Sequence, residues 1–136
     1  MAPKGGVTFF FDENMPRRLA DALRDDLGEG ATHLYHHFGP EGMLDPDVLR
    51  FVGEQGWFLV SRDRKILRRS HERRVIEEMG IGAFFLKDSL NDFCSIVRAL
   101  IHNWPEMKRH ARTRERPFAL LLRERGVVRL GNRHIR

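Results

Sequence analysis

The chain has 136 residues, of which 41% are hydrophobic and 32% are charged, so it can bury the core of one domain. No apolar run reaches the length that crosses a bilayer, and no apolar stretch near the start resembles a signal peptide. Cys94 is the only cysteine, which excludes an intrachain disulfide and a multi-cysteine zinc site. We therefore expect a reduced, cytoplasmic protein with no membrane partner.

The charge is unevenly distributed along the chain. Residues 1–106 contain 14 Lys/Arg and 17 Asp/Glu, a net charge of −3, whereas residues 107–136 contain 10 Lys/Arg and 2 Asp/Glu, a net charge of +8. A basic tail on a mildly acidic body favours a polyanionic partner. An anionic protein or a plain solvated surface fits the same charge.

Short apolar runs alternate with helical patterns along most of the chain. Strands are expected over residues 7–11, 31–35, 57–60 and 82–86. Helices are expected from an Asn14 cap to about residue 27, from an Asp45 cap to about residue 55, over 72–79 and over 90–103. A loop is expected over 36–44 and a helical turn near 66–67, and Trp104-Pro105 should end the last helix.

The end of the chain has a different pattern. Two apolar runs, 118–122 and 127–130, flank a turn in which Gly126 can take a positive φ, which predicts a β-hairpin. With the alternation before it, this pattern predicts an α/β three-layer sandwich with a mostly parallel central sheet plus a short C-terminal β-hairpin. We expect a single domain over residues 1–136, with a core over about 7–104 and a basic C-terminal extension over 105–136.

Acidic residues stand where one predicted element gives way to the next. Asp12 follows the first strand, Asp63 follows the third, and Asp45 opens the helix between them, with Asp47 two residues later. The carboxyl ends of parallel strands share one edge of a sheet, where ligands bind. Carboxylates gathered there can hold Mg²⁺ or Mn²⁺, which activate water toward a phosphodiester. Taken singly, each aspartate also fits a turn or a helix cap.

Basic residues surround Asp63. They are Arg62, Arg64, Lys65 and Arg68, with Arg69 next to them. Cations beside a carboxylate site can bind the phosphates of a nucleic acid, although a solvated helix face has the same pattern. His33, His36 and His37 do not indicate a zinc site, because no cysteine or carboxylate completes a tetrahedral set with them and a loop position explains them more simply.

Three segments together resemble PIN-like domains. They are Phe-Phe-Phe-Asp-Glu-Asn-Met-Pro, Leu-Asp-Pro-Asp-Val-Leu-Arg-Phe-Val and Trp-Phe-Leu-Val-Ser-Arg-Asp-Arg-Lys-Ile. The nearest likeness is to the compact group that includes the VapC-type toxins of toxin–antitoxin operons. In that group an Asp ends the first strand, an Asp opens a helix and a Thr/Ser-x-Asp follows the next strand. Asp12, Asp45 and Ser61-x-Asp63 match in order and spacing, and the resemblance runs from residue 7 to about 86.

This resemblance implies a Mg²⁺- or Mn²⁺-dependent ribonuclease that acts on RNA and is often restrained by a cognate antitoxin protein. It implies that Asp12, Asp45 and Asp63 bind the metal and carry catalysis, with Asn14 and Ser61 in support.

The acidic set departs from that of many PIN domains at two positions. The acid often found in the first helical hairpin would have to be Asp25, Asp26 or Glu29, and Lys65-Ile66 stands where a further acid often follows the Thr/Ser-x-Asp. Asp47 is the natural substitute.

Two alternatives use the same features. A non-catalytic PIN-like module would bind RNA or a partner protein through the basic tail. A phosphorelay receiver would use Asp12, Glu13 and Asp63 with Lys87, although Asp63 lies past its strand rather than at the end of it. The terminal hairpin also offers a sheet edge through which two copies could form a homodimer.

Overall fold

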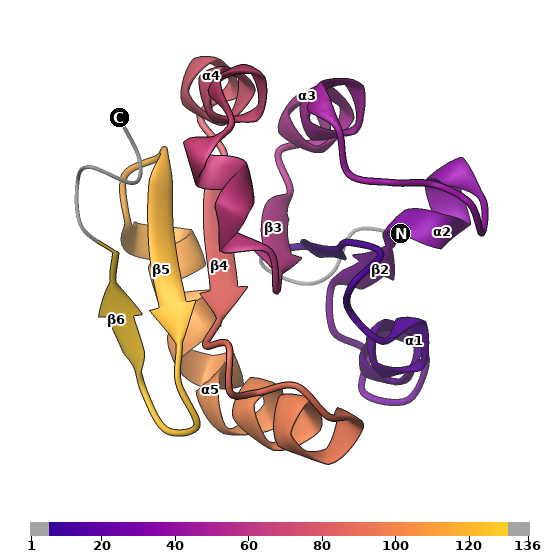
Figure 1. Cartoon of the computed structure of the whole chain (residues 1–136). Coiled ribbons are helices and arrows are strands. Elements are labelled where there is room, and N and C mark those ends of the chain that lie inside the picture. Colours follow the sequence, from indigo (N-terminus) through magenta and orange to yellow (C-terminus); the bar gives the residue numbers. More distant parts are fainter. Residues whose placement is uncertain (1–5, 131–136) are drawn as a thin grey trace.

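Strands and helices alternate along residues 6–130, which are the residues that this computed structural model describes (Figure 1). Their order is β1 (Phe9–Phe11), α1 (Arg17–Asp25), β2 (Ala31–His33), α2 (Leu34–Phe38), α3 (Pro46–Gln55), β3 (Phe58–Ser61), the 3₁₀ helix η1 (Arg64–Arg68), α4 (Ser70–Met79), β4 (Gly82–Leu86), α5 (Phe93–Thr113), β5 (Phe118–Leu122) and β6 (Val127–Arg129). The predicted alternation is confirmed.

One six-stranded sheet, in the order β2-β1-β3-β4-β5-β6, runs through the molecule (Figure 1). The strands β1 to β5 pair in parallel, and β6 returns antiparallel to β5 as the predicted hairpin. The chain moves from β1 to β2 on one side and then to β3 on the other, so the order reverses at β1. Ligands of open α/β sheets bind at such a switch point, beyond the carboxyl ends of the strands.

The sheet is apolar on both faces. Phe9 and Phe11 are fully buried in a cluster with side chains of α1 and α5, and Phe10 is fully buried in a cluster with side chains of α3 and α4. Helices therefore cover both faces, which is why the strands are continuous apolar runs. The predicted three-layer α/β architecture is confirmed.

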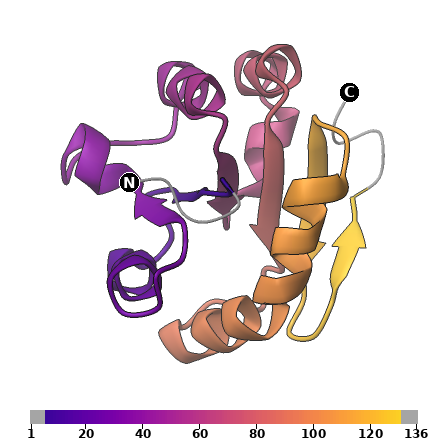
Figure 2. The ribbon, with the colours of Figure 1, turned by 180° about the vertical axis from the view of Figure 1, so that it is seen from behind.

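The helix α5 runs past its predicted end. We expected Trp104-Pro105 to end it, and this prediction was wrong, because α5 continues through Pro105 to Thr113. Proline removes one helical hydrogen bond, but burial on both sides of it stabilises the helix. Trp104 is 7% exposed and Met107 has no exposed surface. Figure 2 shows α5 changing direction as it crosses the sheet.

Residues after position 104 contribute to the core of the sheet. Leu120 and Leu122 on β5 are fully buried in the same cluster as Phe9. The final part of the basic extension, residues 131–136, lies outside the described residues. Among residues 6–130, no helix combines the length and the apolar character needed to cross a membrane.

The start of α1 also differs from the prediction. Pro16 occupies the N-cap position, without a side-chain hydrogen bond, and the helix begins at Arg17. Asn14 is not the cap, because it lies two residues before Pro16. It belongs instead to the turn after β1, where its backbone N–H donates to Oδ1 of Asp12 over 3.1 Å. Asn14 therefore supports the aspartate at the end of β1 rather than the helix.

Candidate functional site

The carboxyl ends of β1 and β3 lie side by side and bring two of the predicted acids together. Phe11 pairs with Val60, so Asp12 and Ser61 follow at the same level of the sheet. The backbone N–H of Asp12 donates to the Val60 carbonyl over 3.2 Å. The Ser61 hydroxyl donates to Oδ2 of Asp12 over 2.5 Å and accepts the backbone N–H of Asp63 over 2.9 Å. Ser61 therefore connects the two aspartates.

The carboxyl group of Asp12 is enclosed by protein. It has no exposed surface, and this burial raises its pKa from 3.8 to about 7. The hydrogen bonds from Ser61 and Asn14 lower the pKa, and the nearby carboxylates of Glu13 and Asp63 raise it further. Asp12 therefore changes protonation near neutral pH. Such perturbed groups concentrate at functional sites, although structural networks contain them too.

Asp63 is the more accessible of the two carboxylates, with 26% of its side chain exposed. Its Oδ1 accepts the backbone N–H of Lys65 over 3.0 Å and caps η1. Its Oδ2 accepts a hydrogen bond from the Arg69 guanidinium over 3.2 Å, and Arg69 also pairs with Glu72 over 3.6 Å. Any cation bound by Asp63 would compete with Arg69.

Asp45 and Asp47 lie at the start of α3. The Asp45 Oδ1 accepts the backbone N–H of Val48 over 2.8 Å, which confirms the predicted helix cap. The carboxylates that shift the pKa of Asp12 belong to Glu13 and Asp63 instead. Within residues 6–130, no three Asp, Glu, His or Cys side chains lie close enough together to hold a metal ion. The structure thus brings Asp12 and Asp63 together, without Asp45 or Asp47.

Glu13 is an acid that the sequence pattern placed only in the receiver alternative and not in the metal site. Its Oε1 accepts the backbone N–H of Leu44 over 3.1 Å. This bond ties the turn after β1 to the loop that leads into Asp45. The signal that pointed to Glu13 was its position directly after Asp12.

The donor chemistry of Asp12 and Asp63 fits Mg²⁺ or Mn²⁺. These ions prefer carboxylate oxygens, and Mg²⁺ in particular is often held by one or two carboxylates while it keeps several waters. A cation beside Asp12 would also favour the ionised form of this buried carboxyl group.

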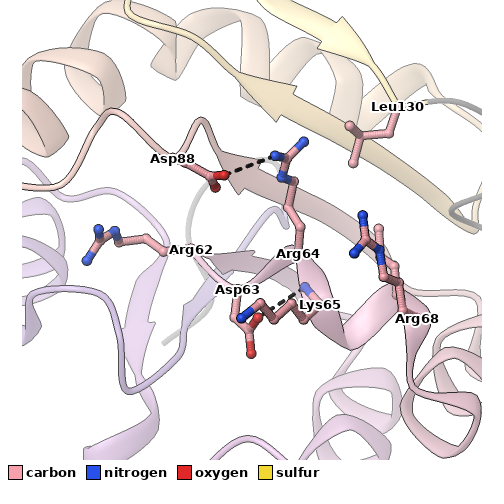
Figure 3. Close-up of a pocket in the computed structure, with 8 residues that line it drawn as sticks. Arg62, Asp63, Arg64, Lys65, Arg68, Asp88 and Leu130 are labelled. Atoms are coloured by element: carbon pink, nitrogen blue, oxygen red, sulfur yellow. Dashed lines mark hydrogen bonds and ion pairs between the residues drawn. The ribbon is translucent and has the colours of Figure 1, made fainter.

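A cationic hollow of about 160 Å³ lies beside Asp63. The cations in its lining are the four predicted ones, Arg62, Arg64, Lys65 and Arg68 (Figure 3). Asp88 also lines it and pairs with Arg64 over 3.3 Å. The other three cations have no carboxylate partner among residues 6–130, so the hollow keeps an excess of positive charge. We call it the first hollow.

His33 shapes the backbone near the candidate site. Its Nδ1 accepts the backbone N–H of Tyr35 over 3.0 Å, which caps α2 where the sequence predicted the end of a strand and a loop. Its Nε2 lies 2.8 Å from the carbonyl oxygen of Met15 and donates to it. These two roles require the neutral ring, and burial lowers the pKa of His33 accordingly.

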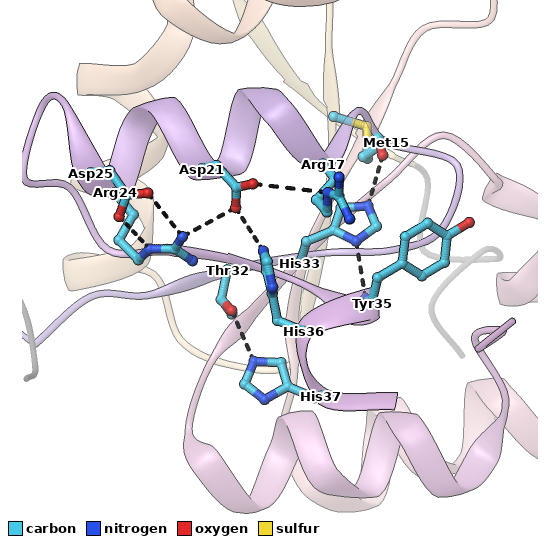
Figure 4. Close-up of polar contacts among 10 residues, drawn as sticks. All are labelled: Met15, Arg17, Asp21, Arg24, Asp25, Thr32, His33, Tyr35, His36 and His37. Atoms are coloured by element: carbon cyan, nitrogen blue, oxygen red, sulfur yellow. Dashed lines mark hydrogen bonds and ion pairs between the residues drawn. The ribbon is translucent and has the colours of Figure 1, made fainter. Parts of the chain in front are cut away.

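The other two histidines of this segment have separate partners. His36 lies 2.7 Å from Oδ1 of Asp21 on α1, and His37 lies 2.8 Å from the hydroxyl of Thr32 (Figure 4). Because the three rings contact different groups, they connect β2, α2 and α1 through separate hydrogen bonds. They do not converge on a common point.

The fold and the site define an α/β domain with two linked carboxylates at its switch point and a cationic hollow beside them. Residues 7–88 match a family model described as a PIN like domain, which spans more than half of the chain. The chain belongs to the PIN-like family, whose members are often nucleases. Searches of curated proteins and of solved structures gave no match.

Proposed function

We propose that this protein is a Mg²⁺- or Mn²⁺-dependent endoribonuclease. The observation that carries the proposal is the junction of Asp12, Ser61 and Asp63 at the switch point of the sheet. Membership of the PIN-like family supports hydrolysis of phosphodiester bonds. Membership of this family also argues against the alternative of a phosphorelay receiver.

Each part of the site has a role in this proposal. Asp12 and Asp63 hold the metal ion, which when bound polarises a phosphoryl oxygen and makes a bound water more acidic. Ser61 fixes the spacing of the two carboxylates through its hydroxyl group. The unpaired cations of the first hollow bind phosphates of the RNA strand next to the bond that is cut.

RNA cleavage by the purified chain tests the proposal. Cleavage should stop when EDTA removes divalent cations and return with Mg²⁺ or Mn²⁺. Asp12→Asn and Asp63→Asn should each lose cleavage while their circular dichroism spectra stay native, and Glu54→Gln, on an exposed part of α3, should cleave normally. Cleavage that survives both aspartate changes would contradict the proposal. RNA binding without cleavage by the unmodified chain would identify a non-catalytic PIN-like module.

Asp45 and Asp47 remain candidate ligands that the same assay separates from helix caps. Asparagine caps a helix about as well as aspartate, so Asp45→Asn should keep α3 intact and remove only the negative charge. If Asp45 binds the ion, this variant loses cleavage without loss of stability. Asp47→Asn gives the same test for the second acid.

We further propose that the ribonuclease is the toxin of a toxin–antitoxin pair. The match of Asp12, Asp45 and Ser61-x-Asp63 to the VapC-type pattern supports this. Expression of the chain in bacteria should arrest growth, and co-expression of the small protein encoded next to it should restore growth. Growth arrest that persists in Asp12→Asn would show that RNA cleavage is not the cause.

A further inference from the structure

A second hollow lies on the other side of the candidate site, between the turn after β1, α1, α2 and the start of α5. The charged side chains in its lining are Arg17, Arg18 and Arg62, and no carboxylate among the described residues lines it. Arg17 has only a long ion pair, 3.9 Å to Asp21, and 58% of its side chain is exposed. The lining of the second hollow therefore has an excess of positive charge.

The two hollows meet at the candidate site. Arg62 lines both of them, so they share one cation. Asp63 lines the first hollow, and Asn14, whose backbone N–H donates to Asp12, lines the second. Asp63 thus borders one hollow and the residue bonded to Asp12 borders the other, so a polyanion that crosses both hollows would pass beside the two carboxylates.

The second hollow also offers aromatic surface, which the first does not. Tyr35 contributes a half-buried ring whose centre lies 4.6 Å from that of His33, and Figure 4 shows the ring extending away from His36 and His37. Phe93 is held on the other side by Arg18, whose guanidinium carbon lies 3.8 Å from the centre of its ring. Aromatic rings beside cations are the means by which proteins bind single-stranded nucleic acid.

We propose that the second hollow binds a nucleotide of a single-stranded RNA, with Arg17 and Arg18 on the phosphate and Tyr35 against the base. The first hollow binds the strand on the opposite side of Asp12 and Asp63. This assignment rests on the proposed action on RNA, and it adds a subsite built partly from α5, which lies outside the residues 7–88 that match the PIN-like family.

Binding of a fluorescently labelled single-stranded RNA of ~10 nucleotides in EDTA, followed by anisotropy, tests the subsite without cleavage. Arg17→Gln/Arg18→Gln should weaken binding roughly tenfold and reduce its salt dependence. The matched control is Arg73→Gln/Arg74→Gln on α4, which removes the same charge from the other face of the sheet. Equal weakening by both pairs would overturn the proposal, since the effect would then come from total charge.

Tyr35 provides the test of base contact. Tyr35→Leu should weaken RNA binding about fivefold or more, because one stacked base is lost. Tyr35→Phe keeps the ring and should restore binding, and inorganic polyphosphate, which has no bases, should bind all three chains equally. Equal RNA binding by Tyr35→Leu and the unmodified chain, both with native melting temperatures, would overturn the base contact.

These outcomes separate the subsite from the nuclease proposal. Specific weakening by the Arg17/Arg18 pair without any metal-dependent cleavage would keep the subsite and reject the nuclease. Metal-dependent cleavage by the unmodified chain, with unchanged RNA binding in Arg17→Gln/Arg18→Gln, would keep the nuclease proposal and reject the subsite. Absence of RNA binding by the unmodified chain would reject the subsite.

Discussion

Asp12 combines complete burial with a position at the switch point of the sheet. A carboxyl group without exposed surface destabilises the folded state when it ionises, because the charge loses its hydration. Among residues 6–130, the Ser61 hydroxyl and the Asn14 N–H are the groups that donate hydrogen bonds to this carboxyl group and offset part of the loss. Keeping an aspartate here has an energetic cost that a hydrophobic residue would avoid, and a bound cation would offset it.

The raised pKa of Asp12 makes stability depend on pH in a defined direction. The folded chain holds the Asp12 proton up to about pH 7, whereas the unfolded chain releases it near 3.8. The stabilisation is complete below pH 3.8 and is lost as the pH rises to about 7. In EDTA, Asp12→Asn should therefore gain stability over the unmodified chain by on the order of 1 kcal/mol per pH unit across this window, and then level off.

Urea unfolding of both chains between pH 4 and 8 measures this difference. His33 contributes in the opposite direction, because its pKa is lowered in the folded chain and its contribution to stability is complete above pH 6.5. This contribution is the same in both chains, so it cancels in the comparison. A difference that does not change with pH would contradict the burial of an ionisable Asp12. Saturating Mg²⁺ should reduce the gain, since the cation stabilises the ionised carboxylate.

Arg69 occupies Oδ2 of Asp63 through an ion pair, so a cation that binds this oxygen must displace it. Because the ion pair is partly exposed, its contribution is modest. Arg69→Gln should tighten Mn²⁺ binding roughly two- to fivefold by removing this competitor. Calorimetric titration with Mn²⁺ measures the change in affinity. The matched control is Arg73→Gln, which removes an arginine from α4, one turn after Arg69. Weaker binding in Arg69→Gln would mean that Arg69 supports the ion site instead.

The helices show where sequence patterns were sufficient. Asp45-Pro46 predicted a capped start for α3, and the side chain makes that cap, because the motif depends on residues within one turn. Pro105 is the opposite case. Its local preference is to end a helix, but the burial of Trp104 and Met107 outweighs that preference, and such contacts with the sheet are not visible in a local pattern.

The position of Pro105 inside α5 gives a prediction about this helix. Proline inside a helix lowers the stability of the folded state by about 3 kcal/mol relative to alanine. It also restricts the unfolded chain, which offsets part of this loss by reducing the entropy gained on unfolding. Pro105→Ala should therefore raise the unfolding free energy by about 1–2 kcal/mol. Urea unfolding measures it, with His102→Ala on the exposed side of α5 as the control. Loss of stability would show that the proline is needed for the packing of α5.

The topology explains which site residues could be foreseen. Asp12 and Asp63 each follow a predicted strand, and pairing of parallel neighbours brings them together. Arg69 and the second hollow could not be foreseen in this way. Arg69 reaches Asp63 around η1, and Arg17, Tyr35 and Phe93 come from three helices whose relative packing no single motif determines.

The molecule as a whole extends beyond the residues that match the PIN-like family. Strand β5 pairs with β4 in parallel, and β6 forms the edge of the sheet, where self-association remains a prediction. Met107, Leu120 and Leu122 have no exposed surface. We therefore expect residues 7–104 to depend on the rest of the chain for their stability.

Truncation tests this dependence. A chain that ends at residue 104 would leave one edge of β4 unpaired and lose nine of the 21 residues of α5, so it should lack a cooperative thermal transition. A chain that ends at residue 130 keeps every described element and should melt like the full-length chain. A cooperative transition in the shorter chain would show that residues 105–136 form a separable extension.

The proposed site requires that Asp12 and Asp63 together hold a single divalent cation. A Mn²⁺ titration followed by electron paramagnetic resonance tests this on the unmodified chain and on Asp12→Asn, Asp63→Asn and Glu54→Gln. We expect one Mn²⁺ site per chain in the unmodified protein and in Glu54→Gln, and loss of this site in both aspartate variants. Unchanged Mn²⁺ binding in Asp12→Asn and Asp63→Asn would show that these carboxylates do not form the site.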